Sequence, residues 1–558
     1  MNRWRRWLRR LAWGVVGLTG LLILTYLLMW ALMWHWVARP PVLAQAPAIT
    51  RLTNEVHGTR VSLGRSWLDR REGLPVLYLA GTPFEIGYAN AALTQQMIRR
   101  QEDTMLELLH RVAPYRWTQF LLKFLVTYKN RELQQHIPAE YQMEILGMTR
   151  GCPDPHPEMG PAFHRVLNYH AAQDISYMLM NSPLLHRGCT GFAAWDTQTR
   201  DGHLLVGRNF DWEPAPVFDE ERILIVFEPD EGIPFVSLAW AGMTGCVSAM
   251  NREGLAIFIN GAPSDLPGQA ATPTCIVARD VVQHARTIAE AVQIIGRHRI
   301  FVSAMFLVAS RNDGRAVVIE KTPDRMVVRE PSGGPRIICA NHYLTGALTN
   351  EPINLKYIQA DTSLPRYARM EELLNRQAGI LDAPGAAALL RDRRLPGDRA
   401  AGNGHRGSLN PLISTHAVVM DLTDGIFWAA CPPHQLGRFI ALDLHNLDRP
   451  LPDQSIPADP LLADGEYQRY LASEQSLKAG WAALKQGQAQ PALDCADQAE
   501  QNNPGFYRTA WLRAESLLAL GRRPEAIAAC AAALAGQPAL GNERSKIEKL
   551  RFRALGNR

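Results

Sequence analysis

The residues best suited to chemistry lie in one short stretch. Cys189 stands in the sequence RGCTGFAAWD, and the segment GRNFD further along supplies Arg208 and Asp211. Two apolar runs joined by the polar turn TQTRDG predict a β-hairpin that holds the cysteine beside these two side chains. A thiol is a good nucleophile only as a thiolate, and a nearby guanidinium and a base favour that form. The stretch therefore predicts a nucleophilic cysteine, with a buried structural cysteine on a strand as the alternative.

The residue pattern of this stretch resembles a known family. The pair Cys189-Thr190, followed by GRNFD at 207–211, is similar to the N-terminal nucleophile (Ntn) hydrolases of the choloylglycine hydrolase and acyl-CoA:isopenicillin N acyltransferase type. The autoproteolytic branch, peptidase C45, is the better match, because an internal cysteine must be released by cutting the Gly188–Cys189 bond. The resemblance implies an α+β fold, a four-layer αββα sandwich in which two antiparallel sheets pack face to face between helical layers.

Three later segments resemble the same family, in the same order along the chain. The sequence MNREGLAIFIN would place Asn260 at the oxyanion site, and CANHYL would make Asn341 the second oxyanion donor. The sequence SLPRYAR would supply Arg366 as the arginine near the nucleophile. The catalytic set implied by the resemblance is Cys189, Arg208, Asp211, Asn260, Asn341 and Arg366.

Other side chains compete for some of these roles. Asn350, in the sequence TNEP, is the alternative to Asn341. His405 or His416 would form a papain-like pair with the cysteine, but no papain-type sequence surrounds Cys189, so this alternative is less favoured. The Gly- and Arg-rich stretch 395–407 is interpreted as a loop, either mobile over the site or an ordinary surface loop.

The predicted catalytic chain, residues 189–446, consists mostly of strands, with one helix over 276–298. Runs of antiparallel strands with inserted helices indicate a layered α+β domain. The predicted strands lie near 221–227, 234–240, 247–250, 255–259, 301–309, 316–320, 325–328, 336–340, 416–422 and 426–430.

The predicted pro-segment, residues 49–188, would become the smaller chain after cleavage. It contains a predicted strand at 76–80 and helices near 117–136 and 139–147. Thr82, Pro83 and Glu85 form a capping box, which predicts the start of a helix directly after the strand.

The N-terminus predicts a membrane anchor. Five arginines crowd residues 1–10, the predicted cytoplasmic tail, and the next charge-free run is long enough for a transmembrane helix over 11–37. Arginines on this side put the N-terminus inside, so a tether at 38–48 leads to a catalytic domain in the periplasm or outside the cell. This interpretation places a single-pass protein in a bacterial cytoplasmic membrane. The alternative is a signal peptide cleaved after Ala44-Gln-Ala46.

Composition excludes several function classes. The net charge of +5 is small for 558 residues and gives no nucleic-acid footprint. Eight cysteines are scattered without CxxC pairs or zinc-ligand spacing, so neither a disulfide framework nor a metal site is predicted. No cofactor is expected either.

The C-terminal part predicts helical repeats. A Pro-rich linker at 447–465 precedes residues 466–558, which match themselves at a period of 34 residues, the tetratricopeptide (TPR) period. Two such repeats are fewer than usually stand alone, so we expect them to pack on the catalytic domain. They could also bind a protein partner. The matching positions are Leu477 with Trp511, Leu484 with Leu518, Gly487 with Gly521, Ala492 with Ala526, and Pro504 with Pro538.

Together these features predict a membrane-anchored, self-cleaving cysteine hydrolase or acyltransferase. It would cleave or transfer the acyl group of a small-molecule or lipid-like N-acyl amide or acyl thioester, through an acyl-enzyme on Cys189. The alternative is a catalytically inactive, membrane-tethered scaffold whose TPR-like repeats bind a protein.

Overall fold

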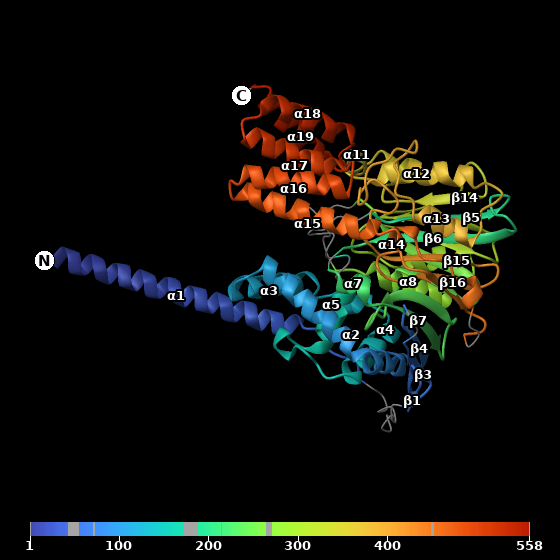
Figure 1. The fold of residues 1–558 in the computed structure, drawn as a ribbon. Coiled ribbons are helices and arrows are strands. Elements are labelled where there is room, and N and C mark those ends of the chain that lie inside the picture. The colour runs from blue at the N-terminus through green and yellow to red at the C-terminus, as the bar shows by residue number, and fades with distance from the viewer. Residues whose placement is uncertain are drawn as a thin grey trace.

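The computed structural model describes residues 2–42, 55–70, 73–171, 174, 188–213, 215–263, 270–447 and 451–556. The signal-peptide cleavage motif at 44–46 lies outside these residues, as do parts of the predicted tether, pro-segment and linker. Two β-sheets lie face to face with helices on their outer sides (Figure 1). The expected αββα layering is therefore observed.

The larger sheet has eleven strands in the described residues, in the order β1-β2-β3-β4-β7-β8-β9-β10-β11-β12-β13. Neighbours are antiparallel except β4 and β7, which are parallel, so the expected purely antiparallel sheet is wrong at this point. The exception is possible because the chain between β4 and β7, residues 82–221, is long enough to form the crossover that a parallel pair requires. The strands are β1 (Glu55–His57), β2 (Arg60–Leu63), β3 (Ser66–Asp69), β4 (Val76–Gly81), β7 (Arg222–Pro229), β8 (Phe235–Trp240), β9 (Ser248–Asn251), β10 (Leu255–Gly261), β11 (Ala304–Ser310), β12 (Arg315–Lys321) and β13 (Met326–Arg329).

The smaller sheet is antiparallel throughout and carries the predicted hairpin at its centre. Its order is β14-β5-β6-β15-β16-β17. The hairpin of β5 and β6 is confirmed, with Thr190 paired to Asn209 and Gly191 paired to Arg208. The strands β1 to β3 and β17 were not predicted from the sequence. The strands of this sheet are β14 (Arg336–Cys339), β5 (Thr190–Asp196), β6 (Gly202–Asp211), β15 (Ser414–Asp421), β16 (Ile426–Ala430) and β17 (Phe439–Asp443).

Three apolar cores hold the layers together. One lies between the two sheets, where Val226 and Val236 of the larger sheet and Val206 and Val418 of the smaller one belong to the same buried cluster. A second joins the larger sheet to helices, and a third joins the smaller sheet to helices. The helices on the larger sheet are α2 (Pro83–Val112), α4 (Ala139–Gly151), α5 (Ala162–His170), α8 (Thr274–His284) and α9 (Ile288–Arg297), and those on the smaller sheet are α12 (Ser363–Arg376) and α13 (Ala383–Leu390).

Local capping decides where the helices begin and end. The capping box at Thr82 and Glu85 is present, so the predicted start of α2 is confirmed. The single helix predicted over 276–298 is wrong, because Thr287 caps a new helix by accepting a hydrogen bond from the Glu290 amide. The helix predicted over 117–136 likewise ends earlier, at Lys129. The remaining helical elements of the body are α3 (Arg116–Lys129), η1 (Leu133–His136), η2 (Pro157–Met159), α7 (Val217–Glu220), α10 (Gly346–Thr349), α11 (Pro352–Ala360) and η3 (Pro452–Gln454).

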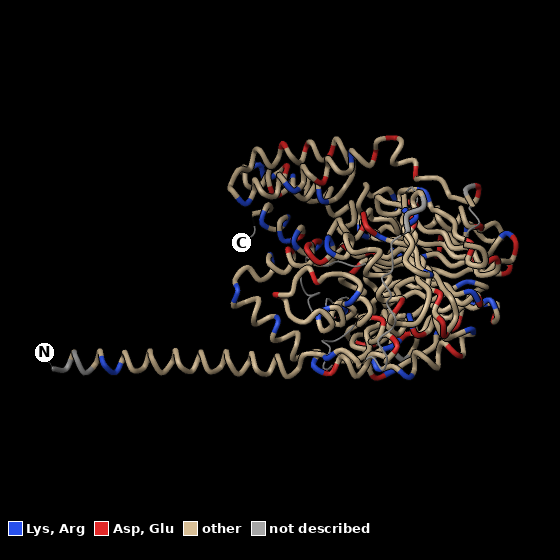
Figure 2. The backbone as a smooth tube through the Cα atoms, turned by 90° about the horizontal axis from the view of Figure 1, so that it is seen from below, with Lys and Arg blue, Asp and Glu red and all other residues tan. Residues whose placement is uncertain are grey.

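Helix α1 (Asn2–Trp36) projects from the body, with its charges near the N-terminal end (Figure 2). Within the described chain it is the one helix long and apolar enough to cross a membrane, over Trp7–Trp36 with a mean hydropathy of 2.2. Its C-terminal part contacts α3, where Trp36 meets Phe124 at a ring distance of 5.9 Å. The amide of Ala38 then donates to His164 Nδ1 at 3.1 Å. The end of α1 is thus docked on the body.

The C-terminal region is a stack of helices (Figure 1). Gly487 and Gly521, 34 residues apart, each follow a helix with a positive φ, at +74° and +77°. Ala492 and Ala526 are both fully buried where helices pack. The helices are α14 (Pro460–Ala463), α15 (Glu466–Lys485), α16 (Ala489–Asn502), α17 (Tyr507–Ala519), α18 (Arg523–Ala535) and α19 (Gly541–Ala554).

The Gly- and Arg-rich stretch 395–407 of the two-sheet body contacts the C-terminal helices. The amide of Asn403 donates to Asn503 Oδ1 at 2.8 Å, and His405 Nε2 lies 2.9 Å from the Gln537 carbonyl oxygen. The stretch is therefore packed against the C-terminal helices along this side.

Candidate active site

Cys189 lies at the entry to β5 and is 2% exposed. Directly across the hairpin, Arg208 on β6 places Nη2 3.9 Å from the cysteine Sγ. Arg208 is completely buried between the sheets, and its guanidinium carbon lies 4.5 Å from the centre of the Phe210 ring. The hairpin thus holds a permanent cation beside the thiol, as its sequence predicted.

Arg208 is fixed by acceptors of the larger sheet. Its nitrogens donate to the carbonyl oxygens of Val247 and Ile259 and to Ser248 Oγ. His416 Nε2 lies 3.2 Å from Arg208 Nη1. Burial holds the pKa of His416 well below its ordinary value, and the two nearby arginines act in the same direction. His416 is therefore a neutral acceptor for Arg208.

Asp211 ends β6 and lies close to Gly188. Its Oδ1 accepts a hydrogen bond from Ser414 Oγ, whereas Oδ2 is buried and has no hydrogen-bond partner among the residues that the structure describes. A Cβ atom placed on Gly188 would lie 3.1 Å from this Oδ2. Burial raises the pKa of Asp211 to about 6, although the Ser414 hydrogen bond and nearby arginines, Arg366 foremost, act to lower it. An Asp211 oxygen without a partner in the described residues therefore lies close to Gly188, the residue before the bond that the sequence predicts to be cut.

Arg366, the fourth residue of α12, reaches the other side of Cys189. Its Nη1 donates to the Cys189 carbonyl oxygen at 2.7 Å and to Thr190 Oγ1, while its Nη2 donates to Asn341 Oδ1 at 2.8 Å. The residue is fully buried. Arg366 thus joins the backbone of Cys189 to one of the two asparagines.

The two asparagines have their amide donors occupied. Asn341 Nδ2 donates to the Gly261 carbonyl oxygen at 2.9 Å, and Asn260 Nδ2 donates to the carbonyl oxygens of Cys339 and Ala340, both at 3.0 Å. Either amide would have to leave these carbonyls to receive an oxyanion. Asn350 is exposed at the end of α10, so the geometry favours Asn341 over it.

The histidine alternatives occupy other positions. His416 contacts Arg208 and Ser248, and His405 bonds to the C-terminal helices. Among the described residues, the side chain that contacts the Cys189 sulfur is thus Arg208, not a histidine.

Several supporting side chains were missed in the sequence. Ser414 bonds Asp211, Ser248 bonds Arg208, and Ser363 Oγ accepts from the Asn341 amide at 2.8 Å. Only Ser363 stands inside a segment that the resemblance had singled out. These serines follow no regular spacing in the sequence. They come close to the site only when the chain folds and the sheets pack.

An apolar cavity of about 190 Å³ adjoins this network. It lies between α2, α4 and α5 of the N-terminal segment and the strands β6 and β8. Phe210 is in its wall, and the same ring packs against Arg208. The cavity is thus one side chain away from the arginine beside Cys189. Other lining residues include Ile98, Met105, Met148, Trp212, Trp240 and Met243.

Comparison with known proteins gives one family match. Residues 197–403 match the family model for acyl-coenzyme A:6-aminopenicillanic acid acyl-transferase. The match spans well under half of the chain and begins just after Cys189, so it contains the other five residues of the predicted catalytic set. This region is therefore similar to acyltransferases.

Individual relatives are distant. An uncharacterized protein of Archaeoglobus fulgidus is 26% identical over 347 residues, which cover 56% of this chain and 57% of that protein. The acyl-coenzyme A:6-aminopenicillanic-acid-acyltransferase 40 kDa form of Emericella nidulans is 23% identical over 304 residues, covering 54% of this chain and 78% of that protein. The chain spans a little over half the length of the first relatives it matches.

Among solved structures, a mutant of conjugated bile acid hydrolase from Clostridium perfringens aligns with 47% of this chain and 95% of its own. The sequence identity is 15% and the TM-score is 0.33.

Proposed function

We propose that this chain is a membrane-anchored Ntn cysteine hydrolase or acyltransferase, which cuts itself at Gly188–Cys189 and then acts on N-acyl amides or acyl thioesters. The observation that carries the proposal is the buried Oδ2 of Asp211, which lies beside Gly188 and has no hydrogen-bond partner within the described part of the chain. A buried carboxylate oxygen without a donor is costly. An α-amino group released at Cys189 would provide the missing donor.

The first step is self-cleavage. The Cys189 thiolate attacks the Gly188 carbonyl carbon, the peptide nitrogen leaves as the new α-amine, and a thioester joins Gly188 to the sulfur. Water then hydrolyses the thioester, giving a Gly188 carboxylate and a free thiol. Arg366 holds the Cys189 carbonyl and Arg208 lies beside the sulfur, so both sides of the reacting residue are fixed.

The second step acts on a substrate. The α-amine of Cys189, held by Asp211, serves as general base for its own thiol, which attacks the acyl carbonyl and releases an amine or a thiol. Water or an amine then takes the acyl group from the cysteine. Asn260 and Asn341, or a backbone N–H, are the proposed oxyanion donors, and loss of one donor typically costs about 10²–10³ in rate.

An apolar acyl group is the proposed substrate portion. The adjoining cavity is walled by apolar side chains such as Phe210, Trp240 and Met148. Its charged lining residues are paired with one another, because Arg165 forms ion pairs with Glu102 and Asp154. A cavity of this lining favours an aliphatic or aromatic chain over a charged one.

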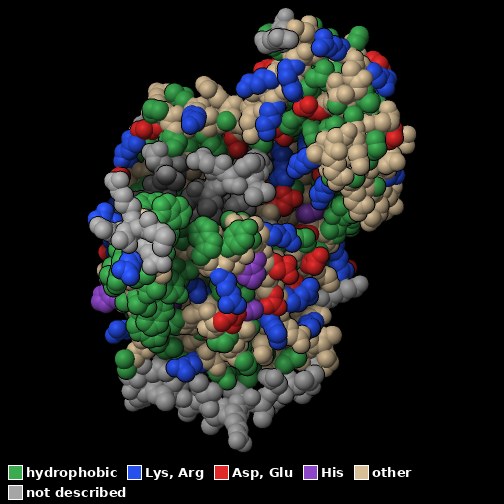
Figure 3. Space-filling model, turned by 90° about the vertical axis from the view of Figure 1, so that its left-hand side faces the viewer, with side chains coloured by type: hydrophobic (Ala, Val, Ile, Leu, Met, Phe, Trp, Pro, Cys, Tyr) green, Lys and Arg blue, Asp and Glu red, His purple; other side chains and the backbone are tan. Residues whose placement is uncertain are grey.

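Membrane attachment is proposed from α1 and its neighbour α3. The outward face of α3 exposes Trp117 at 67%, Leu125 at 47% and Leu121 at 41%. Hydrophobic side chains gather on the side of the molecule from which α1 projects (Figure 3). A helix with such a face can lie in the membrane interface beside an anchor helix.

The test is the chain composition of purified wild-type protein beside Cys189→Ala. Wild type should give two chains, residues 1–188 and 189–558, and Cys189→Ala one uncut chain, by intact mass and denaturing gel. Cys495→Ala, which removes a thiol from the C-terminal helices, is the matched control and should be cut like wild type. A single chain in wild type would reject self-cleavage and favour the inactive scaffold.

A further inference from the structure

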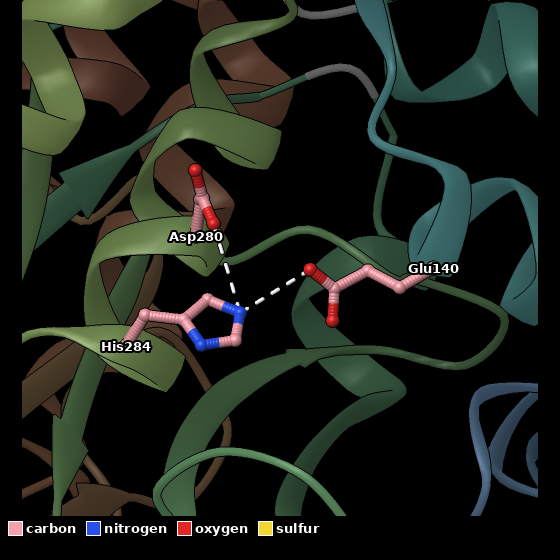
Figure 4. Close-up of side chains that lie close together, drawn as sticks. All are labelled: Glu140, Asp280 and His284. Atoms are coloured by element: carbon pink, nitrogen blue, oxygen red, sulfur yellow. Dashed lines mark hydrogen bonds and ion pairs between the residues drawn. The ribbon is translucent and has the colours of Figure 1, made fainter.

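Three potential metal ligands from two parts of the chain converge outside the candidate active site (Figure 4). Asp280 and His284 lie one turn apart on α8, and Glu140 lies in the first turn of α4. His284 Nε2 is 3.2 Å from Glu140 Oε1 and 3.7 Å from Asp280 Oδ1. All three ligand atoms lie within 4.8 Å of one another.

We infer that Glu140, Asp280 and His284 form a binding site for a divalent transition-metal ion, with Zn²⁺ the best match. Zinc bonds of about 2.0–2.1 Å in tetrahedral geometry separate neighbouring ligand atoms by about 3.3 Å. The distances from His284 Nε2 to Glu140 Oε1 and Asp280 Oδ1, 3.2 and 3.7 Å, lie on either side of this separation. One imidazole and two carboxylates are a ligand set that zinc accepts, with water in the fourth position.

Outer hydrogen bonds orient both carboxylates. Gln283 Nε2 donates to Glu140 Oε2 at 2.9 Å, and His298 Nε2 lies 2.7 Å from Asp280 Oδ2. Each partner takes one carboxylate oxygen, and the other lies toward His284 Nε2; Asp280 Oδ1 also accepts a 3.5 Å hydrogen bond from the Tyr141 hydroxyl. Such outer partners fix ligand orientation in metal sites.

Solvent can reach the site. The side chains of His284 and Glu140 are 34% and 31% exposed. Asp280 and His284 line an open hollow together with Pro138, Arg297 and His298. A hydrated ion can therefore enter and keep a water ligand. Because Glu140 precedes residue 188 and the other two ligands follow it, the ion would join the two chains that the proposed cleavage creates.

The test is Zn²⁺ titration of the full chain in detergent, purified without a His tag and dialysed against a chelator. Calorimetry should find one Zn²⁺ per chain, and Co²⁺ should give the visible d–d absorption of a four-coordinate site. His284→Ala and Glu140→Gln should each abolish both signals. His298→Ala should keep the stoichiometry and weaken binding by about 10–100-fold, as expected for an outer partner.

The matched control is His203→Ala, which removes the imidazole from a second His/Asp group near Asp421 and Asp424. Binding should persist in this variant. Loss of binding in His203→Ala, or unchanged binding in His284→Ala with a native circular dichroism spectrum, would overturn the inference. If wild type shows no stoichiometric Zn²⁺ binding, the three side chains form only an ion-pair network, and the inference is likewise overturned.

Discussion

The guanidinium of Arg366 donates a 2.7 Å hydrogen bond to the carbonyl oxygen of Cys189, 177 positions earlier in the chain. The same side chain also holds Asn341 Oδ1 and Thr190 Oγ1. Helix α12 therefore fixes the backbone immediately after the Gly188–Cys189 bond, and the first prediction concerns this contact.

Arg366→Lys should slow self-cleavage by about 100-fold, because one ammonium cannot hold all three acceptors and a small misplacement of a reacting group is costly. Arg366→Ala should in addition lower the free energy of unfolding by at least about 2 kcal/mol, since buried acceptors lose their donor. The measurements are the time course of the cut chain and thermal unfolding. Arg376→Lys, on the exposed part of the same helix, is the control. Wild-type cleavage by Arg366→Lys would contradict the prediction.

The pH dependence of stability should report on Asp211. Its pKa in the folded chain, about 6, exceeds the ordinary value of 3.8. Between these values the folded state binds more protons than the unfolded state, so this group's contribution to stability falls as pH rises through that window. The full loss is roughly 3 kcal/mol.

Asp211→Asn should remove this dependence. We expect this in an uncut Cys189→Ala background, measured by urea unfolding of the detergent-solubilised chain. The stability of Asp211→Asn relative to its parent should be higher at pH 7 than at pH 4. Equal stability differences at both pH values would show that burial does not perturb this carboxyl. In the background with Cys189 intact, the same substitution should impair activity, because the α-amine loses its partner.

Gly188→Ala should hinder self-cleavage with little change in folding. The added Cβ would lie 3.1 Å from Asp211 Oδ2 and 3.5 Å from the Arg366 guanidinium, and the first of these distances is closer than side chains usually pack. Gly346→Ala is the matched control, because no described atom beyond its own neighbours along the helix lies within 4 Å of its Cβ position. The measurements are the rate of self-cleavage and the Tm of both variants. Uninhibited cleavage in Gly188→Ala would mean that the peptide group can shift away from Asp211.

Local sequence signals located much of the fold. Turn residues and apolar runs identified the β5–β6 hairpin, and the capping box at Thr82 identified the start of α2. The break between α8 and α9 was missed, because a single Thr287 cap within an apolar helical pattern is a weak signal. The parallel pairing of β4 with β7 was missed because it depends on long-range packing.

The candidate site was predictable only where residues stand in a recognisable segment. Arg208 and Asp211 lie on the strand next to Cys189, so a hairpin alone places them. Arg366 reaches the cysteine from a helix of another layer, and only the family resemblance pointed to it. Ser414 and Ser248 carry no sequence signal, since they are selected by the buried polar atoms they satisfy.

His405→Ala should loosen the C-terminal helices without affecting cleavage at Gly188. The substitution removes the hydrogen bond to the Gln537 carbonyl and a ring contact with Tyr507. The packing of the C-terminal helices on the body should lose about 1–2 kcal/mol of free energy. Limited proteolysis should then cut faster within residues 447–465, whereas the exposed His110→Ala should match wild type. Loss of self-cleavage in His405→Ala would instead support the alternative in which His405 forms a papain-like pair with Cys189.

The smaller chain should retain α1. Trp36 packs on Phe124 and Tyr128, and the amides of Ala38 and Arg39 bond to His164 and Gln134, so the end of the helix is part of the folded body. The intact mass of the smaller chain should therefore correspond to residues 1–188, and the chain should resist alkaline extraction from membranes, because a spanning helix is effectively irreversibly inserted. A mass corresponding to a chain that begins at Pro47 would identify α1 as a cleaved signal peptide.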